Sequence, residues 1–150
     1  MTTLTTFHAS CSCNQLTLQF SQAPRFQLVC HCNDCRKITG EAYLSGAFFA
    51  AEPGAIQGES LVETGIGGSG KPRHNHRCKN CGDFIFAEIE ALKGIIAVDG
   101  KRLKTPFRFE PQAHVWTSQK LPEVSIPVGV LAFERRPALS LVMPDATKPA

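Results

Sequence analysis

The sequence predicts a mainly β fold in a single domain that spans residues 1–150. Short segments that are apolar, or that alternate between apolar and polar residues, recur along the chain, and turn-forming residues separate them. No long window shows the 3.6-residue spacing of an amphipathic helix. The apolar content of 43% and the charged content of 19% are typical of a globular chain. At 150 residues the chain is long enough for one hydrophobic core.

Seven segments are expected to form strands. The clearest is residues 16–20, because Leu16, Leu18 and Phe20 alternate with polar residues and therefore share one face. The other six carry β-branched or aromatic residues between turn signals: residues 4–9, 26–30, 42–51, 61–64, 84–89 and 95–98.

The remaining stretches predict short helical turns, loops and a tail. A helical turn is expected after Asp34, as far as Thr39. The glycine-rich stretch 65–70 predicts the tip of a flexible hairpin. An edge strand is expected over Val128–Phe133, and a mobile tail over Asp145–Ala150.

Seven cysteines form three groups along the chain. The groups are Cys11-Ser12-Cys13, Cys30-His31-Cys32-Asn33-Asp34-Cys35 and Cys78-Lys79-Asn80-Cys81-Gly82. An odd number of cysteines excludes a complete set of intrachain disulfides. The first residues show no basic region followed by an apolar one, so no signal peptide is expected. We therefore expect a cytoplasmic, reducing environment, in which clustered cysteines more often bind a metal ion than pair.

The two flanking pairs together supply the four thiolates of a closed, structural zinc site. Cys11 and Cys13 would point to the same side of an extended strand. Cys78 and Cys81 can grip one ion across a tight turn. Spacing alone leaves an alternative, because Cys32 and Cys35 with Cys78 and Cys81 also form a four-cysteine set. Their sequence gap is longer than usual, and this set leaves Cys11, Cys13 and Cys30 without a role.

The central triplet is better explained as a unit of its own. Cys30 and Cys32 would share a strand face, and Cys35 would return on the following turn. Three sulfurs leave one coordination position of zinc open to water or substrate. A redox pair formed by Cys32 and Cys35 is the rival interpretation, and it gives Cys30 no role.

The order of these motifs resembles the glutathione-dependent formaldehyde-activating enzyme family, which includes centromere protein V. The cysteine pattern carries the resemblance, and three further segments agree with it: Cys35-Arg36-Lys37 followed by Gly40, then Ser69-Gly70-Lys71, then Pro111-Gln112-Ala113-His114-Val115-Trp116. The resemblance covers roughly residues 7–122 and leaves residues 123–150 as a C-terminal extension.

The resemblance implies a zinc-stapled, β-tent-like fold and two zinc ions per chain. Cys11, Cys13, Cys78 and Cys81 would hold the structural ion. Cys30, Cys32 and Cys35 would hold the catalytic ion. The implied activity is that of a carbon–sulfur lyase acting on S-hydroxymethylglutathione, with glutathione as the thiol and formaldehyde as the aldehyde. The alternative within the same family is a noncatalytic zinc scaffold that binds a partner.

Polar residues around the triplet have less specific roles. His31 lies between two candidate ligands and should point to the opposite face, where a structural role is expected. Asp34 is expected to cap the helical turn, and orientation of a ligand is the alternative. Arg36 and Lys37 would either attract the carboxylates of a glutathione-like substrate or remain solvated.

The charge of the chain argues against a nucleic-acid partner. The formal net charge of +3 treats every cysteine as a neutral thiol. Seven thiolates on two Zn²⁺ ions would bring the net charge to about zero. The chain has no long run of lysine and arginine, so neither nucleic acid nor a membrane surface is an expected partner. No apolar run reaches the roughly 18 residues that a membrane span requires.

Overall fold

The structure is a computed structural model, and it describes residues 6–67 and 70–136. Its strands are β1 Phe7–Ser10, β2 Thr17–Phe20, β3 Phe26–Cys30, β4 Leu44–Ala50, β5 Ile56–Gln57, β6 Ser60–Ile66, β7 Pro72–Cys78, β8 Phe84–Ile89, β9 Ile95–Asp99, β10 Ala113–Val115 and β11 Leu131–Ala132. The α-helix α1 spans Asn33–Thr39, and three 3₁₀ turns cover Glu90–Leu92, Gly100–Arg102 and Thr117–Gln119. The expected mobile tail over Asp145–Ala150 lies outside the described residues, as does Ser69 of the resemblance.

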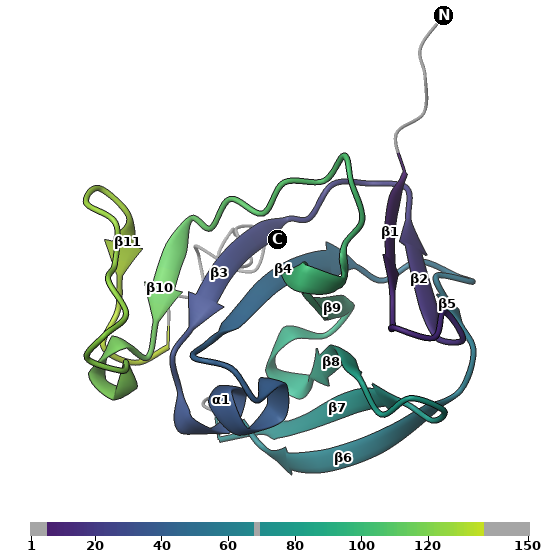
Figure 1. Ribbon diagram of the computed structural model, residues 1–150, viewed down its shortest axis with the longest axis horizontal. Helices are drawn as coiled ribbons and strands as arrows, with labels where there is room; N and C mark the ends of the chain where they lie inside the picture. Colours follow the sequence, from purple (N-terminus) through teal and green to yellow (C-terminus); the bar gives the residue numbers. More distant parts are fainter. Residues whose placement is uncertain (1–5, 68–69, 137–150) are drawn as a thin grey trace, which may run out of the picture.

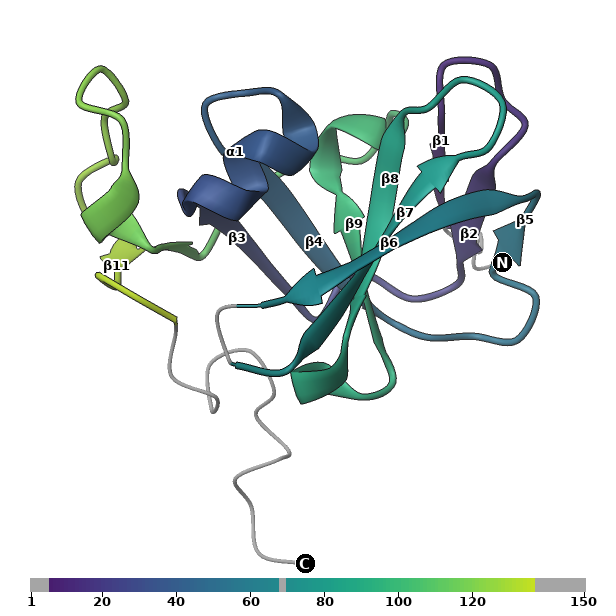
Figure 2. The same ribbon diagram turned by 90° about the horizontal axis from the view of Figure 1, so that it is seen from below.

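The strands form two sheets. The larger sheet has the order β11-β10-β3-β4-β9-β8-β7-β6, and the smaller one has the order β1-β2-β5. Neighbouring strands run antiparallel except at β10, which is parallel to both β3 and β11. Figure 1 shows the smaller sheet at one side of the molecule and β11 at the other, and α1 lies near β3 and β4 in Figure 1 and in Figure 2. No helix in the described part of the chain is long and apolar enough to cross a membrane.

Two clusters of buried side chains form the core, and each contains one group of cysteines. The first cluster includes Phe20 and Phe49, whose rings stack with centroids 4.3 Å apart, and it also contains the two flanking cysteine pairs. The second includes Phe26 and Phe48 together with the cysteines of the triplet. Successive side chains of a strand point to opposite faces, so the neighbours Phe48 and Phe49 of β4 enter different clusters. The two cysteine groups are thereby placed on different sides of the larger sheet.

The prediction of a mainly β, single-domain fold is confirmed. The residues expected as strands at 26–30 and 84–89 coincide with β3 and β8. The edge strand expected over Val128–Phe133 is present but shorter, as β11 over Leu131–Ala132, which pairs with β10 at the edge of the larger sheet. The glycine-rich stretch does join two strands of a hairpin, in which the Gly67 amide donates to the Lys71 carbonyl over 2.9 Å.

The strand β7 was not among the segments expected as strands. Its sequence, Pro-Arg-His-Asn-His-Arg-Cys, has neither an apolar run nor apolar–polar alternation. It forms because it pairs along its length with β6 on one side and with β8 on the other. Backbone pairing with two neighbours here overrides weak intrinsic strand propensity.

Candidate metal centres

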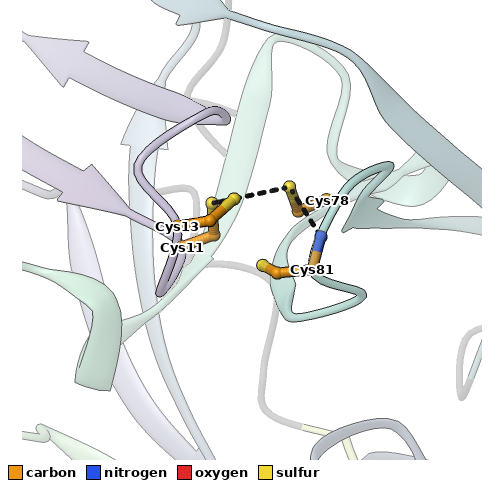
Figure 3. A group of neighbouring side chains, drawn as sticks. All are labelled: Cys11, Cys13, Cys78 and Cys81. Carbon is orange, nitrogen blue, oxygen red and sulfur yellow. Dashed lines mark hydrogen bonds between the residues drawn. The ribbon is translucent and has the colours of Figure 1, made fainter.

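Four cysteines from two turns meet in the first cluster. Cys11 and Cys13 follow β1, which ends at Ser10, so the expectation that they lie on an extended strand is wrong. The chain turns instead, because the Asn14 amide donates to the Cys11 carbonyl over 3.1 Å and Asn14 adopts a left-handed φ of 62°. Cys78 is the last residue of β7, and Cys81 lies in the turn that leads to β8. Figure 3 shows the four side chains converging from the two turns.

The spacing of these four sulfurs fits a tetrahedral metal site. The Sγ atoms of Cys11 and Cys13 are 3.5 Å apart, and those of Cys13 and Cys78 are 3.6 Å apart. All four Sγ atoms lie within 4.8 Å of one another. Zinc–sulfur bonds of about 2.3 Å in a tetrahedron place sulfurs about 3.8 Å apart. The group can therefore hold a metal ion, and its geometry is consistent with zinc.

Backbone amides and a carboxylate support the four-cysteine group. The Leu16 amide donates to Cys11 Sγ over 3.4 Å, and the Cys81 amide donates to Cys78 Sγ over 3.5 Å. Asp83 braces the two turns, because its Oδ2 accepts a hydrogen bond of 2.8 Å from the Ser12 amide. The hydrogen bonds from Ser12 hold the pKa of Asp83 below its usual value of 3.8. The carboxylate thus ties the first cysteine turn to the second.

The cysteines of the triplet meet at the start of α1. Cys30 is the last residue of β3, Cys32 is the N-cap of α1, and Cys35 lies in its first turn. Their Sγ atoms lie within 4.8 Å of one another. The expectation that Cys30 and Cys32 share a strand face is wrong, because the chain leaves β3 after Cys30. The structure nevertheless brings the three sulfurs together as one group, separate from the other four cysteines.

The cap of α1 is a thiol and not the expected carboxylate. Cys32 Sγ accepts a hydrogen bond of 3.2 Å from the Cys35 amide. Asp34 is the second residue of the helix and lies in its first turn, so the expectation that it caps the helix is wrong. A sulfur that carries negative charge is well placed here, because the free amides at the start of a helix favour an anion.

The three thiols differ in their electrostatic environment. Hydrogen bonds from Cys30 and Cys35 lower the pKa of Cys32 to about 2. The hydrogen bonds with Cys32 and Cys35, together with burial, raise the pKa of Cys30. For Cys35, the hydrogen bond with Cys30 lowers the pKa, but the contact with Cys32 and burial outweigh it and raise the value to about 11. Negative charge therefore concentrates on Cys32, and a metal ion would be needed to deprotonate all three thiols.

A cavity of about 390 Å³ adjoins the triplet. It lies between α1 and the β6–β7 hairpin, and its wall includes Cys32, Asp34, Lys37, Arg73, Asn75 and Arg77. Of the three cysteines, only Cys32 lines this cavity and is partly exposed, whereas Cys30 is 8% exposed and Cys35 is fully buried. The group is thus closed on its core side and open toward the cavity.

Arg73 and Asn75 are residues of this cavity that none of the sequence motifs includes. They alternate with His74 on β7, and Asn75 is buried. Arg73 Nε donates to Asn75 Oδ1 over 2.8 Å, and its Nη1 lies 3.6 Å from Cys35 Sγ. The signal that could have found them is the alternation of basic and polar residues just before Cys78, but it needed β7 to be recognised as a strand.

Arg36 forms hydrogen bonds within the fold, whereas Lys37 lines the cavity. Arg36 Nη1 donates to the His31 carbonyl over 2.7 Å. His31 is fully buried, and its Nε2 lies 2.8 Å from His114 Nδ1. Burial and the neighbouring His114 lower the pKa of His31 to about 4. Of the two basic residues expected to attract a substrate, only Lys37 is exposed at the cavity.

Two further histidines of β7 point away from the cavity. His74 Nε2 lies 2.8 Å from Glu90 Oε2, and His76 Nε2 lies 2.7 Å from Glu88 Oε1. Within residues 6–67 and 70–136, the groups of three or more side chains placed to hold a metal ion are the two cysteine groups, and neither includes a histidine.

Comparison with known proteins gives one family. The family model described as "glutathione-dependent formaldehyde-activating enzyme" matches residues 6–119, which is more than half of the chain and includes all seven cysteines. No curated protein matches the chain significantly.

Proposed function

Because the chain belongs to the glutathione-dependent formaldehyde-activating enzyme family, we propose that it is a zinc-dependent carbon–sulfur lyase. Its substrate would be a thiol–aldehyde adduct such as S-hydroxymethylglutathione, which it would form or cleave. The family itself supports glutathione-related formaldehyde activation. The lyase class, the identity of the metal as zinc and the roles of individual residues are our proposal.

The observation that carries the proposal is the open side of the triplet. Three cysteines form a group with a single face toward a cavity of about 390 Å³. The four-cysteine group, by contrast, already has the full ligand number of a structural zinc site. The arrangement therefore favours a structural ion at Cys11, Cys13, Cys78 and Cys81 and a catalytic ion at Cys30, Cys32 and Cys35.

The chemistry needs a thiol to be deprotonated and held close to a carbonyl carbon. A zinc ion held by Cys30, Cys32 and Cys35 would supply an open position at which a thiol can lose its proton at neutral pH. In the forward reaction the sulfur–carbon bond forms, the carbonyl π bond breaks, and the proton lost by the thiol is balanced by one gained at the former carbonyl oxygen. The exposed Lys37 gives the cavity a cationic group that suits the carboxylates of a peptide thiol.

The cysteines also bear on where the protein works. The structure shows all seven as free thiols, although Cys11 and Cys13 bring their sulfurs within 3.5 Å of one another. We propose a reducing compartment, the cytoplasm, in which such neighbouring thiols stay available for a metal ion.

The test combines metal analysis with adduct exchange. Thiols add to formaldehyde without a catalyst, so exchange between free and hydroxymethylated glutathione is measured by NMR with and without the protein. We expect two zinc ions per chain and exchange faster than the uncatalysed rate. Cys32→Ser should abolish the acceleration and retain the fold. His74→Asn, on the opposite face of β7 from the cavity, is the matched control and should keep it.

The alternatives predict different results. A noncatalytic zinc scaffold would bind two zinc ions, and neither the wild type nor Cys32→Ser would accelerate exchange. A redox enzyme that uses Cys32 and Cys35 would hold one zinc ion per chain and leave these two thiols free to form a disulfide. Either result would overturn the proposal.

A further inference from the structure

The guanidinium of Arg73 lies between the cysteine triplet and the cavity wall. Its Nη1 approaches Cys35 Sγ to 3.6 Å, and Asn75 holds its Nε. Its Nη2 atom is buried and has no hydrogen-bond partner among the described residues. A buried, unpaired donor atom on a cation is costly unless an anion accepts from it.

The other charged groups of the cavity have partners of opposite sign or lie in solvent. Arg77 pairs with Glu63, with 2.6 Å between Nε and Oε1, and also donates to the Ile38 carbonyl. Lys37 and Asp34 are exposed residues of α1. Arg73 forms no ion pair with a carboxylate in residues 6–67 and 70–136, so the sulfurs are the anionic groups that it faces.

Charge explains why a cation is needed at this place. Three thiolates on a divalent ion leave one net negative charge, and a thiolate in the fourth position raises it to two. Two uncompensated negative charges in a partly buried site are strongly unfavourable. A neutral fourth ligand, such as water or imidazole, adds no charge and does not need this compensation.

We infer that Arg73 is the counter-cation of the triplet site, and that it selects an anionic thiolate over a neutral ligand for the fourth position. The inference rests on the proposed function, because it presumes that the triplet holds a metal ion that binds a thiol. Arg73 acts as a positioning residue through Cys35, and Asn75 fixes the plane of its guanidinium. When the thiol binds, its proton leaves to solvent and the sulfur keeps the electron pair.

The size of the effect follows from the charges. The two charges are the Arg73 guanidinium and a thiolate in the fourth position. At a separation of about 6 Å and an effective dielectric constant of about 20, their attraction corresponds to roughly 100-fold in the affinity for the thiolate. Arg73 is only half-buried, so solvent screening reduces the interaction. We expect removal of the cation to weaken thiolate binding by about 10- to 100-fold, and to change binding of a neutral ligand by less than about threefold.

Cobalt in place of zinc makes the fourth position visible. The full-length protein is loaded with two Co²⁺ ions per chain, and ligand binding is followed by the visible absorption of the triplet ion. The probes are 2-mercaptoethanol, which has no carboxylate, and imidazole, which is neutral. Arg73→Met removes the charge, and Arg73→Lys retains it without the planar fork. Lys104→Gln is the control, because it removes one positive charge at an exposed position that does not line this cavity.

We expect that only Arg73→Met loses the preference for 2-mercaptoethanol over imidazole. Arg73→Met should bind 2-mercaptoethanol about 10- to 100-fold more weakly and imidazole as the wild type does. Arg73→Lys should recover most of the thiol affinity, and Lys104→Gln should change neither affinity by more than about threefold. Equal losses for both ligands, no loss at all, or failure of Arg73→Lys to recover binding would overturn the inference alone. A wild-type protein whose cobalt spectrum does not respond to 2-mercaptoethanol would overturn the proposed function as well.

Discussion

Replacement of Cys78 by serine tests the closed metal centre most directly. Cys78 is 1% exposed, and its sulfur lies 3.6 Å from Cys13 Sγ. It joins the end of β7 to the turn that follows β1, two segments far apart in the sequence. Serine keeps the backbone hydrogen bonds of the turn, such as the 2.9 Å bond from the Gly82 amide to the residue-78 carbonyl. The substitution therefore removes one ligand and little else.

The magnitude follows from the ligand number. A structural zinc site contributes about 10–16 kcal/mol of apparent binding free energy at neutral pH. Loss of one of four equivalent ligands removes about a quarter of that, or roughly 2.5–4 kcal/mol. A domain of this size loses about 2–4 °C in melting temperature for each kcal/mol, so we expect a decrease of about 5–16 °C. The effect is a large fraction of the total stability of an ordinary domain.

The assay is thermal unfolding followed by circular dichroism at fixed zinc concentration. Lys79→Ser is the control, because it changes the neighbouring residue and removes only the exposed Lys79–Glu59 ion pair, and it should unfold at nearly the wild-type temperature. If Cys78→Ser unfolded at the same temperature as Lys79→Ser and kept two zinc ions per chain, the four-cysteine group would not be a structural site.

Three further predictions concern stability and metal retention. Asp83→Asn should lower the melting temperature at neutral pH. The hydrogen bonds from Ser12 lower the pKa of Asp83, so its stabilisation is full above 3.8 and is lost as the pH falls through the lower folded value. The difference in melting temperature between Asp83→Asn and the wild type should therefore become smaller at acid pH. A difference that stayed constant with pH would contradict the stabilising role of the Asp83 carboxylate. Phe49→Ala should cost about 3–5 kcal/mol in the free energy of unfolding measured with urea, because the ring is fully buried and stacks on Phe20, and a cost below 1 kcal/mol would be inconsistent with that packing. A strong chelator should first remove the ion of the open triplet, without a change in the circular dichroism of the protein. The ion of the four-cysteine group should leave more slowly, together with unfolding, and a zinc-responsive dye follows both releases. Release of both ions in one phase would argue against two different sites.

The grouping of the cysteines could be predicted from the sequence, but the local structure around them could not. Spacing identified which residues could be ligands, because metal geometry restricts the separation of thiolates in the chain. It did not reveal that Cys11 and Cys13 lie on a turn, since a left-handed Asn14 leaves no apolar pattern. Nor did it reveal that Cys32 caps α1, because the N-cap residues expected from sequence are oxygen acceptors such as Asp34.

Strands with apolar faces could be predicted, whereas polar strands could not. β3 and β8 contain buried apolar residues, and their bounds agree with the expected segments. β7 is polar along its whole length and owes its conformation to its neighbours in the sheet. Arg73, which no motif marks, acquires its place beside Cys35 only because β7 is a strand. The prediction therefore reached the cysteines that could hold metal ions but not the residues that surround them.

The polar strand β7 also connects the two metal centres. Its even-numbered residues include Cys78 of the four-cysteine group, and its odd-numbered residues include Arg73, which lies beside Cys35 of the triplet. Few apolar side chains hold β7 in place, so its register depends on backbone pairing with β6 and β8 and on the anchor at Cys78. A shift of one residue in that register would move Arg73 to the other face of the sheet and away from Cys35. A metal ion at the four-cysteine group would therefore do more than stabilise the fold, because it would fix the strand that places Arg73 beside the triplet.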